Sequence, residues 1–246
     1  MRRTIRISAL GVVVAVAVGL PITAVMAQRA ESGEVVLAHG ADRFPSQTAS
    51  DWVTYADYVV AVSAVAEEEI PPTKEALAHG EGVILREMTL KVDQVLWARG
   101  GARKPAPASF TWTAFGWTFT DGSTANRTEM AGAGEPRIET GHRYIMAIDW
   151  QPARCAPGDF IPGQWRGLGD GSTVPFDGKS IGKGEMQGKE QTVAQARAAA
   201  DPTDPNYGLK DRMAGRGAGA LAKVLSSATP ATKKQFGPPP AQTSCG

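Results

Sequence analysis

The run FTWTAFGWTFT, residues 110–120, holds five aromatic side chains and decides which fold we expect. Its first half alternates aromatic residues with threonine, as in a strand with one buried face. After Ala114 the alternation shifts by one residue, which would send the later aromatic residues to the opposite face of a regular strand. A β-bulge near Ala114, one extra residue in the strand, would return them all to one side. These aromatic residues are Phe110, Trp112, Phe115, Trp117 and Phe119.

Two interpretations of this run differ in what they imply for function. Aromatic side chains can form a platform on which sugars or single-stranded nucleic acid stack, and such platforms usually carry interleaved basic residues. No basic residue lies between Phe110 and Thr120. An exposed aromatic patch of this size is also unfavourable without a partner. We therefore interpret the run as core, in a sheet whose bulges bend it toward a small barrel.

Three neighbouring segments also carry strand patterns. Residues 58–66 are rich in β-branched side chains. Residues 86–97 alternate, with apolar side chains at every second position from Met88 to Val92, and residues 142–150 alternate in the same way. Together with the aromatic run they predict a mainly β fold, a small antiparallel OB-like barrel followed by short C-terminal helices.

The order of these segments resembles exported bacterial proteins with an OB-like β-barrel. The resemblance rests on ADYVVAVSAV, then LREMTLKVDQVLWARG, the aromatic run and GHRYIMAID, and it covers roughly residues 50 to 180. Some proteins of that shape are related to the tissue inhibitors of metalloproteinases. Those inhibitors depend on an N-terminal cysteine framework that this chain lacks, so the resemblance implies the shape and not inhibition.

Changes in composition divide the chain into five segments. The last two are marked by helix-forming residues and then by a Pro-rich end. The predicted organisation is a signal peptide or membrane anchor (1–27), an irregular tether (28–48), the β-barrel domain (49–182), a helical extension (183–228) and an extended tail (229–246).

The N-terminus has the pattern of an export signal. Arg2, Arg3 and Arg6 precede an apolar stretch over residues 7–20, and small or branched residues lead to Ala27. The same segment, if uncleaved, is just long enough to anchor the chain in a membrane. In both cases the arginines stay on the cytoplasmic side, and we expect a secreted or extracytoplasmic, membrane-anchored protein.

Export gives the two cysteines a structural meaning. Cys155 and Cys245 are the only cysteines in the chain, and disulfides persist in oxidising compartments. We expect them to pair and to hold a tail that has no apolar pattern of its own. Two free thiols or an intermolecular bridge are the alternatives.

The sequence carries little that indicates catalysis or nucleic-acid binding. The formal net charge is +1, which gives no basic face for nucleic acid. No H-E-x-x-H, G-x-S-x-G, P-loop or C-x-x-C motif is present. The run GRGAGA, residues 215–220, formally fits a dinucleotide fingerprint, but no strand pattern precedes it. We therefore expect no cofactor.

The three histidines are the remaining candidates for chemistry. His39 and His79 lie in identical LAHG contexts with an acidic residue nearby, and His142 begins a predicted strand. Three histidines with carboxylates can bind zinc, but nothing in the sequence brings these together, and we interpret them as solvated residues without a metal.

The leading hypothesis is a non-enzymatic envelope protein that binds an extracellular or envelope protein or ligand. It touches the membrane only through its N-terminal segment. The alternatives are an envelope hydrolase with an unrecognised site, built on His142, Asp149 and nearby serines, and a purely structural module.

Overall fold

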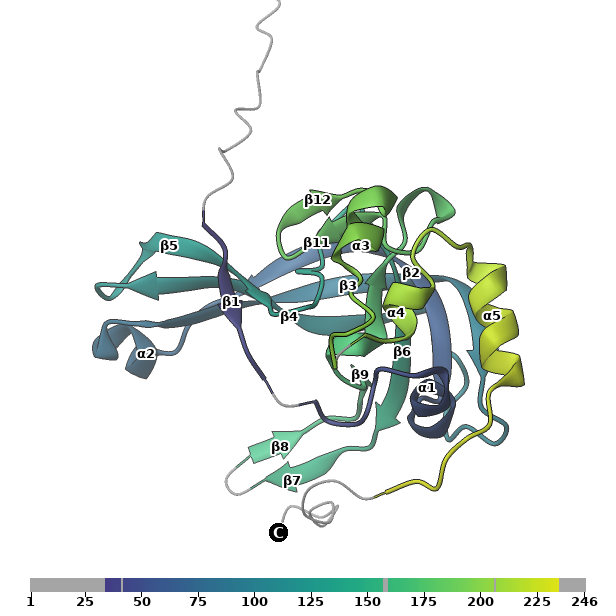
Figure 1. Cartoon of the computed structure of the whole chain (residues 1–246). Coiled ribbons are helices and arrows are strands. Elements are labelled where there is room, and N and C mark those ends of the chain that lie inside the picture. The colour runs from purple at the N-terminus through teal and green to yellow at the C-terminus, as the bar shows by residue number, and fades with distance from the viewer. Residues whose placement is uncertain (1–33, 41, 157–158, 206, 235–246) are drawn as a thin grey trace, which may run out of the picture. The chain divides into compact units, whose positions relative to one another are not determined.

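An eight-stranded mixed sheet organises the chain (Figure 1). The computed structural model describes residues 34–40, 42–156, 159–205 and 207–234. Its strands follow the order β1-β5-β4-β3-β2-β6-β10, and β9 also pairs with β6. The strands of this sheet are β1 (Val36–Ala38), β2 (Tyr58–Ile70), β3 (Gly82–Ala98), β4 (Ser109–Thr120), β5 (Ser123–Gly132), β6 (Arg143–Gln151), β9 (Gln164–Gly167) and β10 (Thr173–Pro175).

Smaller elements surround the sheet. Two hairpins pair β7 with β8 and β11 with β12. Their strands are β7 (Arg154–Ala156), β8 (Asp159–Ile161), β11 (Gly184–Met186) and β12 (Lys189–Gln191). The helices are α1 (Ala49–Tyr55), α2 (Lys74–His79), α3 (Val193–Ala199), α4 (Leu209–Arg212) and α5 (Ala218–Ser227), with short 3-10 turns η1 (Asp170–Ser172) and η2 (Asp177–Lys179). Among the described residues, no helix has the length and apolarity to cross a membrane.

The mainly β prediction is confirmed, but the closed antiparallel barrel is not found. Within the described residues no ladder joins β1 to β9 or β10, and β1 pairs with β5 in parallel, so the sheet is open and mixed. The physical reason is length, because β1, β9 and β10 have only three or four residues each. The sheet nevertheless curls: a Cβ placed on Gly167 of β9 would lie 2.8 Å from the Trp112 ring of β4.

The first half of β2 is buried on both faces. Val59 and Ala61 pack into one apolar cluster with α1, α4 and α5. Val60 and Val62 pack into a second cluster with Met88 and other residues of β3, β4 and β6. A continuous apolar run is the expected sequence of a strand covered on both sides. The C-terminal helices are therefore a layer of the core, on the face opposite the aromatic run.

The predicted β-bulge exists, two residues beyond the predicted position. Trp117 pairs with Ile84 and Phe115 pairs with Leu85, which leaves Gly116 as the extra residue of β4. Residues directly opposite each other share a face. The bulge therefore returns Trp117 and Phe119 to the face of Phe110, while Phe115 lies on the other face. Phe110 and Phe119 are buried; Trp112, Phe115 and Trp117 are half-buried.

Two buried arginines hold this bulge. Arg86 Nε donates to the Phe115 carbonyl at 2.9 Å, and a terminal nitrogen of Arg137 donates to the Gly116 carbonyl at 2.7 Å. Arg86 also donates to the Arg137 carbonyl at 2.6 Å. Because a bulge interrupts the backbone ladder, these guanidinium groups supply donors that the neighbouring strand does not.

Replacing Gly116 with alanine should destabilise the fold. The new Cβ would lie 2.6 Å from the Ile84 carbonyl oxygen and 3.0 Å from Arg86 Cγ, so backbone must move. We expect a loss of about 1–3 kcal/mol in the free energy of unfolding, measured by urea denaturation. Gly219→Ala is the matched control, because a Cβ there meets nothing within 4 Å and the residue lies in α5. That change should stabilise by about 0.5–1 kcal/mol, and equal losses in both variants would contradict the role of the bulge.

Two predictions about the ends of the chain concern residues that the structure does not describe. The signal or anchor segment 1–27 and Cys245 lie outside the described residues. Cys155 lies in β7, half-buried. Its pairing with Cys245 stays a prediction.

Candidate functional site

A cleft of about 490 Å³ opens where β4 curls toward β9. Residues 111–115 of β4 form one wall, with the Trp112 and Phe115 side chains on opposite faces of the strand, and β9 with its following turn forms another. The segment around His39 and Asp42 and the loop after β5 complete the lining. The curl of the sheet that brings β4 to β9 thus also creates the cleft.

Three carboxyl groups meet at one end of this cleft: Asp42, Glu135 and Asp170, here called the acidic cluster. Asp42 is fixed by two hydrogen bonds, one from the Asp170 backbone N–H at 2.7 Å and one from Ser46 Oγ at 2.7 Å. Asp170 begins η1, and Glu135 follows the turn after β5. Residues distant in sequence therefore converge because three loops meet at the mouth of the curled sheet.

Burial and the closeness of the three carboxyl groups raise pKa values in the acidic cluster. Burial, helped by the negative charges of Asp170 and Asp42, raises the pKa of Glu135 to about 7. Burial and the neighbouring Asp42 raise the pKa of Asp170 as well. Lys210 opposes both shifts, but its ammonium group also donates to the Gly134 carbonyl at 3.0 Å. An additional cation in the cleft would therefore be stabilised.

Arginines occupy other parts of the lining. Arg43 forms an ion pair with Asp149 and donates to the Gly167 carbonyl at 2.8 Å, which ties the N-terminal segment to β6 and β9. Arg137 is buried, pairs with Glu139, and has no hydrogen-bond partner for its Nε among the described residues. A buried donor without an acceptor is unfavourable.

The aromatic run divides between core and cleft. Trp112 lies edge-on to Phe110, with ring centroids 6.5 Å apart, and lines the cleft together with Phe115. Trp117 has guanidinium groups of the protein over its ring, from Arg127 at 4.1 Å and Arg137 at 5.2 Å. The run itself has no basic residues, but arginines from other segments lie over the Trp117 ring and cover its face.

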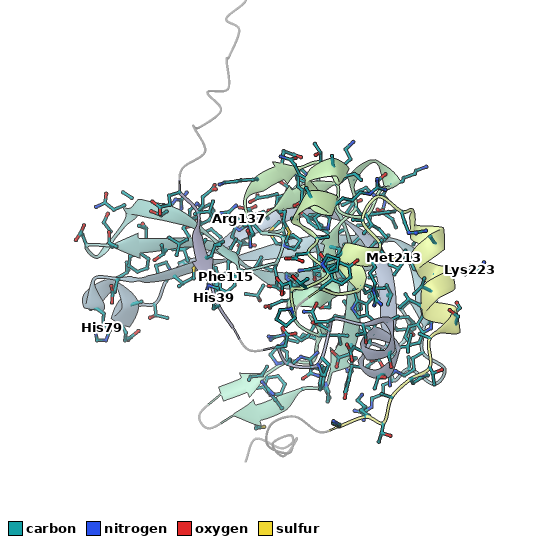
Figure 2. The ribbon with its side chains drawn as sticks, in the orientation of Figure 1. His39, His79, Phe115, Arg137, Met213 and Lys223 are labelled. Carbon is teal, nitrogen blue, oxygen red and sulfur yellow. The ribbon has the colours of Figure 1, made fainter. Side chains whose placement is uncertain are left out.

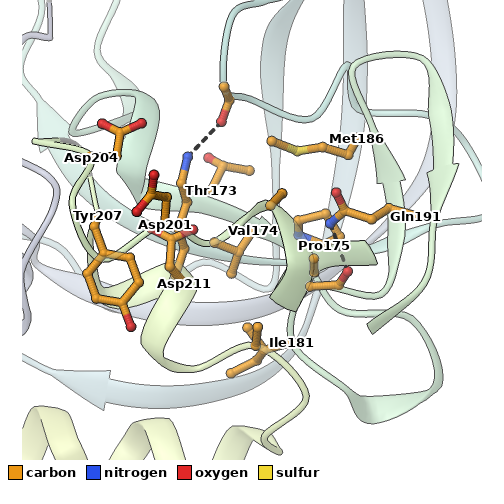
Figure 3. Close-up of a pocket in the computed structure, with 16 residues that line it drawn as sticks. Thr173, Val174, Pro175, Ile181, Met186, Gln191, Asp201, Asp204, Tyr207 and Asp211 are labelled. Carbon is orange, nitrogen blue, oxygen red and sulfur yellow. Dashed lines mark hydrogen bonds between the residues drawn. The ribbon is translucent and has the colours of Figure 1, made fainter. Parts of the chain in front are cut away.

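A second pocket, of about 290 Å³, lies between β10 and the C-terminal helices (Figure 3). Its apolar side is formed by residues such as Val174 and Ile181. Its carboxylates already have structural partners: Asp201 accepts from Thr203, and Asp211 accepts from the Gly208 N–H at the start of α4. We therefore regard the larger cleft as the better candidate.

The structure separates the histidines that the sequence singled out. His39 lines the cleft, and His79 ends α2; Figure 2 shows them well apart. His142 precedes β6, with Nδ1 2.6 Å from Asp177 Oδ2 and Nε2 3.5 Å from Glu190 Oε1. Neither of the other histidines joins that group within the described part of the chain.

The residues of the alternative hydrolase site are also apart. His142 and Asp149 are seven positions apart on one extended strand, roughly 23 Å, and Asp149 pairs with Arg43. Ser63, which lies opposite Arg143 across β2 and β6, donates to Asp93 at 2.6 Å.

The acidic cluster was not predicted from the sequence, because its members lie in three separate loops. The only signal in the sequence was the DGST turn that begins at Asp170.

Comparison with known protein families finds no matching family model, and comparison with curated proteins finds no matching sequence. Inference about the cleft therefore rests on the chemistry of this chain's own residues.

Proposed function

We propose that this protein is an exported, non-enzymatic binding module whose cleft holds a cationic amino sugar at the cell envelope. The acidic cluster, placed in the same cleft as Trp112 and Phe115, is the observation that supports it. The same proposal includes three further points: the chain is exported through residues 1–27, Cys155 and Cys245 form a disulfide, and the curled, open sheet derives from an OB-like barrel.

Each part of such a ligand matches a feature of the cleft. An ammonium group would neutralise the acidic cluster, and charge-assisted hydrogen bonds to carboxylates are among the stronger polar contacts. The apolar face of a sugar ring would lie against an aromatic side chain, as ligand pockets commonly combine aromatic walls with few polar groups.

Binding of a cation should release protons. Because an ammonium group favours ionised carboxyls, it lowers the pKa of Glu135 from about 7 toward its ordinary value. The affinity for a ligand that stays cationic should therefore increase as the pH rises from about 6 to 8. A glucosamine ammonium group, which loses its own proton at or below the α-amino range of about 7.7, should bind most tightly near pH 7. A neutral ligand of the same shape should not show this increase.

Calorimetric titration with a glucosamine oligosaccharide and its N-acetylated counterpart tests the proposal. We expect the cationic sugar to bind at least about tenfold more tightly, equivalent to about 1.4 kcal/mol. Glu135→Gln and Asp170→Asn should each weaken it by about tenfold or more, since each removes a charged partner. Asp201→Asn, at the rim of the second pocket, is the control and should leave the affinity unchanged. Equal binding of both sugars, or no binding of either, would refute the proposal.

A second candidate is supported by the pKa of Glu135 alone. A carboxyl group that titrates near 7 beside other carboxyl groups is the arrangement used by general acids in glycoside hydrolysis. In that case Glu135 would protonate a leaving-group oxygen, and Asp42 or Asp170 would act as base or nucleophile. Product analysis with the same two sugars separates the candidates: turnover that Glu135→Gln abolishes would favour the hydrolase, and tight binding without turnover would favour the binding module.

A further inference from the structure

We propose that His142, Asp177 and Glu190 form a binding site for a zinc-like divalent cation. They come from three segments: the residue before β6, the start of η2, and the middle of β12. None of them lines the cleft. The site is therefore independent of the proposed sugar site.

The geometry is close to that of a single ion. One ligand atom from each of the three side chains lies within 4.8 Å of the others. Two ligands of a zinc ion, at about 2.0–2.2 Å from it, are at most about 4 Å apart. The side chain of Glu190 is 63% exposed, so a small rotation about its own bonds can complete the approach.

Asp177 is already oriented for this role. Its Oδ1 accepts the Arg143 backbone N–H at 2.8 Å, which directs Oδ2 toward the imidazole of His142. Gly184 packs against the same carboxylate, where an added Cβ would lie 2.8 Å from Oδ2. The two side chains are thus held together by a hydrogen bond, and an ion that binds both would replace the proton between Nδ1 and Oδ2, which would then separate to roughly 3–4 Å. Imidazole with carboxylates is a donor set that zinc accepts.

The local charge also favours a cation. The β11–β12 hairpin places Glu190 directly opposite Glu185, and like charges in that position are destabilising. Glu185 is buried and accepts hydrogen bonds from the Arg137 and Gly188 backbone N–H groups, so it does not move away. A divalent ion would relieve this repulsion.

The ion would act as a clamp. It would join Glu190 of β12 to the start of β6, while Glu185 of β11 joins the same hairpin to the residues after β5. With three protein ligands, a zinc ion keeps a fourth position for water. We expect micromolar affinity and a rise in the melting temperature of the metal-free protein on addition of Zn²⁺.

Calorimetric titration of the metal-free full chain with Zn²⁺ tests the site. We expect one ion per chain, and a loss of at least about tenfold in affinity for His142→Gln and Glu190→Gln. His39→Gln and His79→Gln are matched controls, since both are exposed histidines near an acidic residue, and they should bind as the original protein does. Circular dichroism establishes that each variant is folded.

Cobalt provides a second measurement. Co²⁺ in a site of one imidazole and two carboxylates should give visible absorption that is absent from His142→Gln and retained in His39→Gln. Retention of one-to-one Zn²⁺ binding by His142→Gln, or its loss in either control variant, would overturn the proposal. Failure of this site leaves the sugar-binding test unaffected, because the two sites share no residue.

Discussion

Arg86→Met is expected to lower the free energy of unfolding by about 3–5 kcal/mol, the largest effect of any single substitution considered. The Arg86 side chain is fully buried and forms ion pairs with Glu67 at 2.8 Å and Glu139 at 3.3 Å. It also donates to the Phe115 and Arg137 carbonyls. Methionine can fill the space but donates no hydrogen bond, so the Phe115 and Arg137 carbonyls lose a donor and Glu67 loses its counter-ion, while Glu139 keeps only Arg137.

Arg127→Met is the matched control for this prediction. Arg86 lies over the Trp117 ring, 5.8 Å from its centroid, and Arg127 lies over the same ring. Arg127 pairs with Glu69 at 2.7 Å, but both partners of that ion pair are more than a third exposed. Exposed ion pairs contribute about 0–1 kcal/mol. Urea denaturation should therefore separate the two variants by at least about 2 kcal/mol. Similar losses would mean that contact with the ring, and not the buried hydrogen bonds, carries the effect.

Arg86 also shows how far the sequence predicts the sheet. The alternation that places Met88 and Leu90 on one face of β3 continues back to position 86, so the pattern puts an arginine on the buried face. The structure confirms that face, with all three side chains fully buried. The pattern does not explain why an arginine is tolerated at this buried position. The partners of Arg86 come from β2, from the bulge of β4 and from residues 137–139, which are distant in sequence.

For β6, the sequence pattern predicted only one of the two buried faces. The predicted face, with Tyr144, Met146 and Ile148, is buried in one apolar cluster. Ile145 and Ala147 on the opposite face are buried as well, in the cluster with the helices. Alternation predicts a half-buried strand, whereas a strand covered on both sides depends on what packs against it. The open sheet was missed for the same reason, since barrel closure depends on the lengths of edge strands.

The acidic cluster could not be predicted from the sequence. Asp42, Glu135 and Asp170 lie in three loops, 93 and 35 residues apart, and no spacing rule connects them. Only the curl of the sheet brings these loops together. The bulge of β4 was predictable from the shift in the aromatic pattern, whereas the curl of the sheet, which brings Trp112 against Gly167 of β9 and forms a cleft wall, required the tertiary structure.

Stability should fall as the pH rises from about 5 to 8, because of the acidic cluster. Glu135 has an ordinary pKa of 4.5 in the unfolded chain and a pKa of about 7 in the folded one. Between these values the folded state binds more protons than the unfolded state, so the free energy of unfolding decreases with increasing pH. Both states are protonated at Glu135 below pH 4.5, and the decrease is complete above pH 7. Because Glu135 is partly exposed, we expect about 1–3 kcal/mol in total.

Glu135→Gln isolates this contribution. Glutamine is neutral at every pH, so the variant should equal the original protein near pH 5 and exceed it by about 1–3 kcal/mol at pH 8. Some decrease should remain in the variant, since the pKa of Asp170 is also raised. Glu81→Gln, at an exposed position, should follow the original protein throughout. Urea denaturation at several pH values measures these differences, and parallel curves for the original protein and Glu135→Gln would contradict a raised pKa at Glu135. The buried negative charge that destabilises the empty cleft at pH 8 is the charge that a bound ammonium group would neutralise. The stability curve and the binding of a ligand that stays cationic should therefore change over the same pH range.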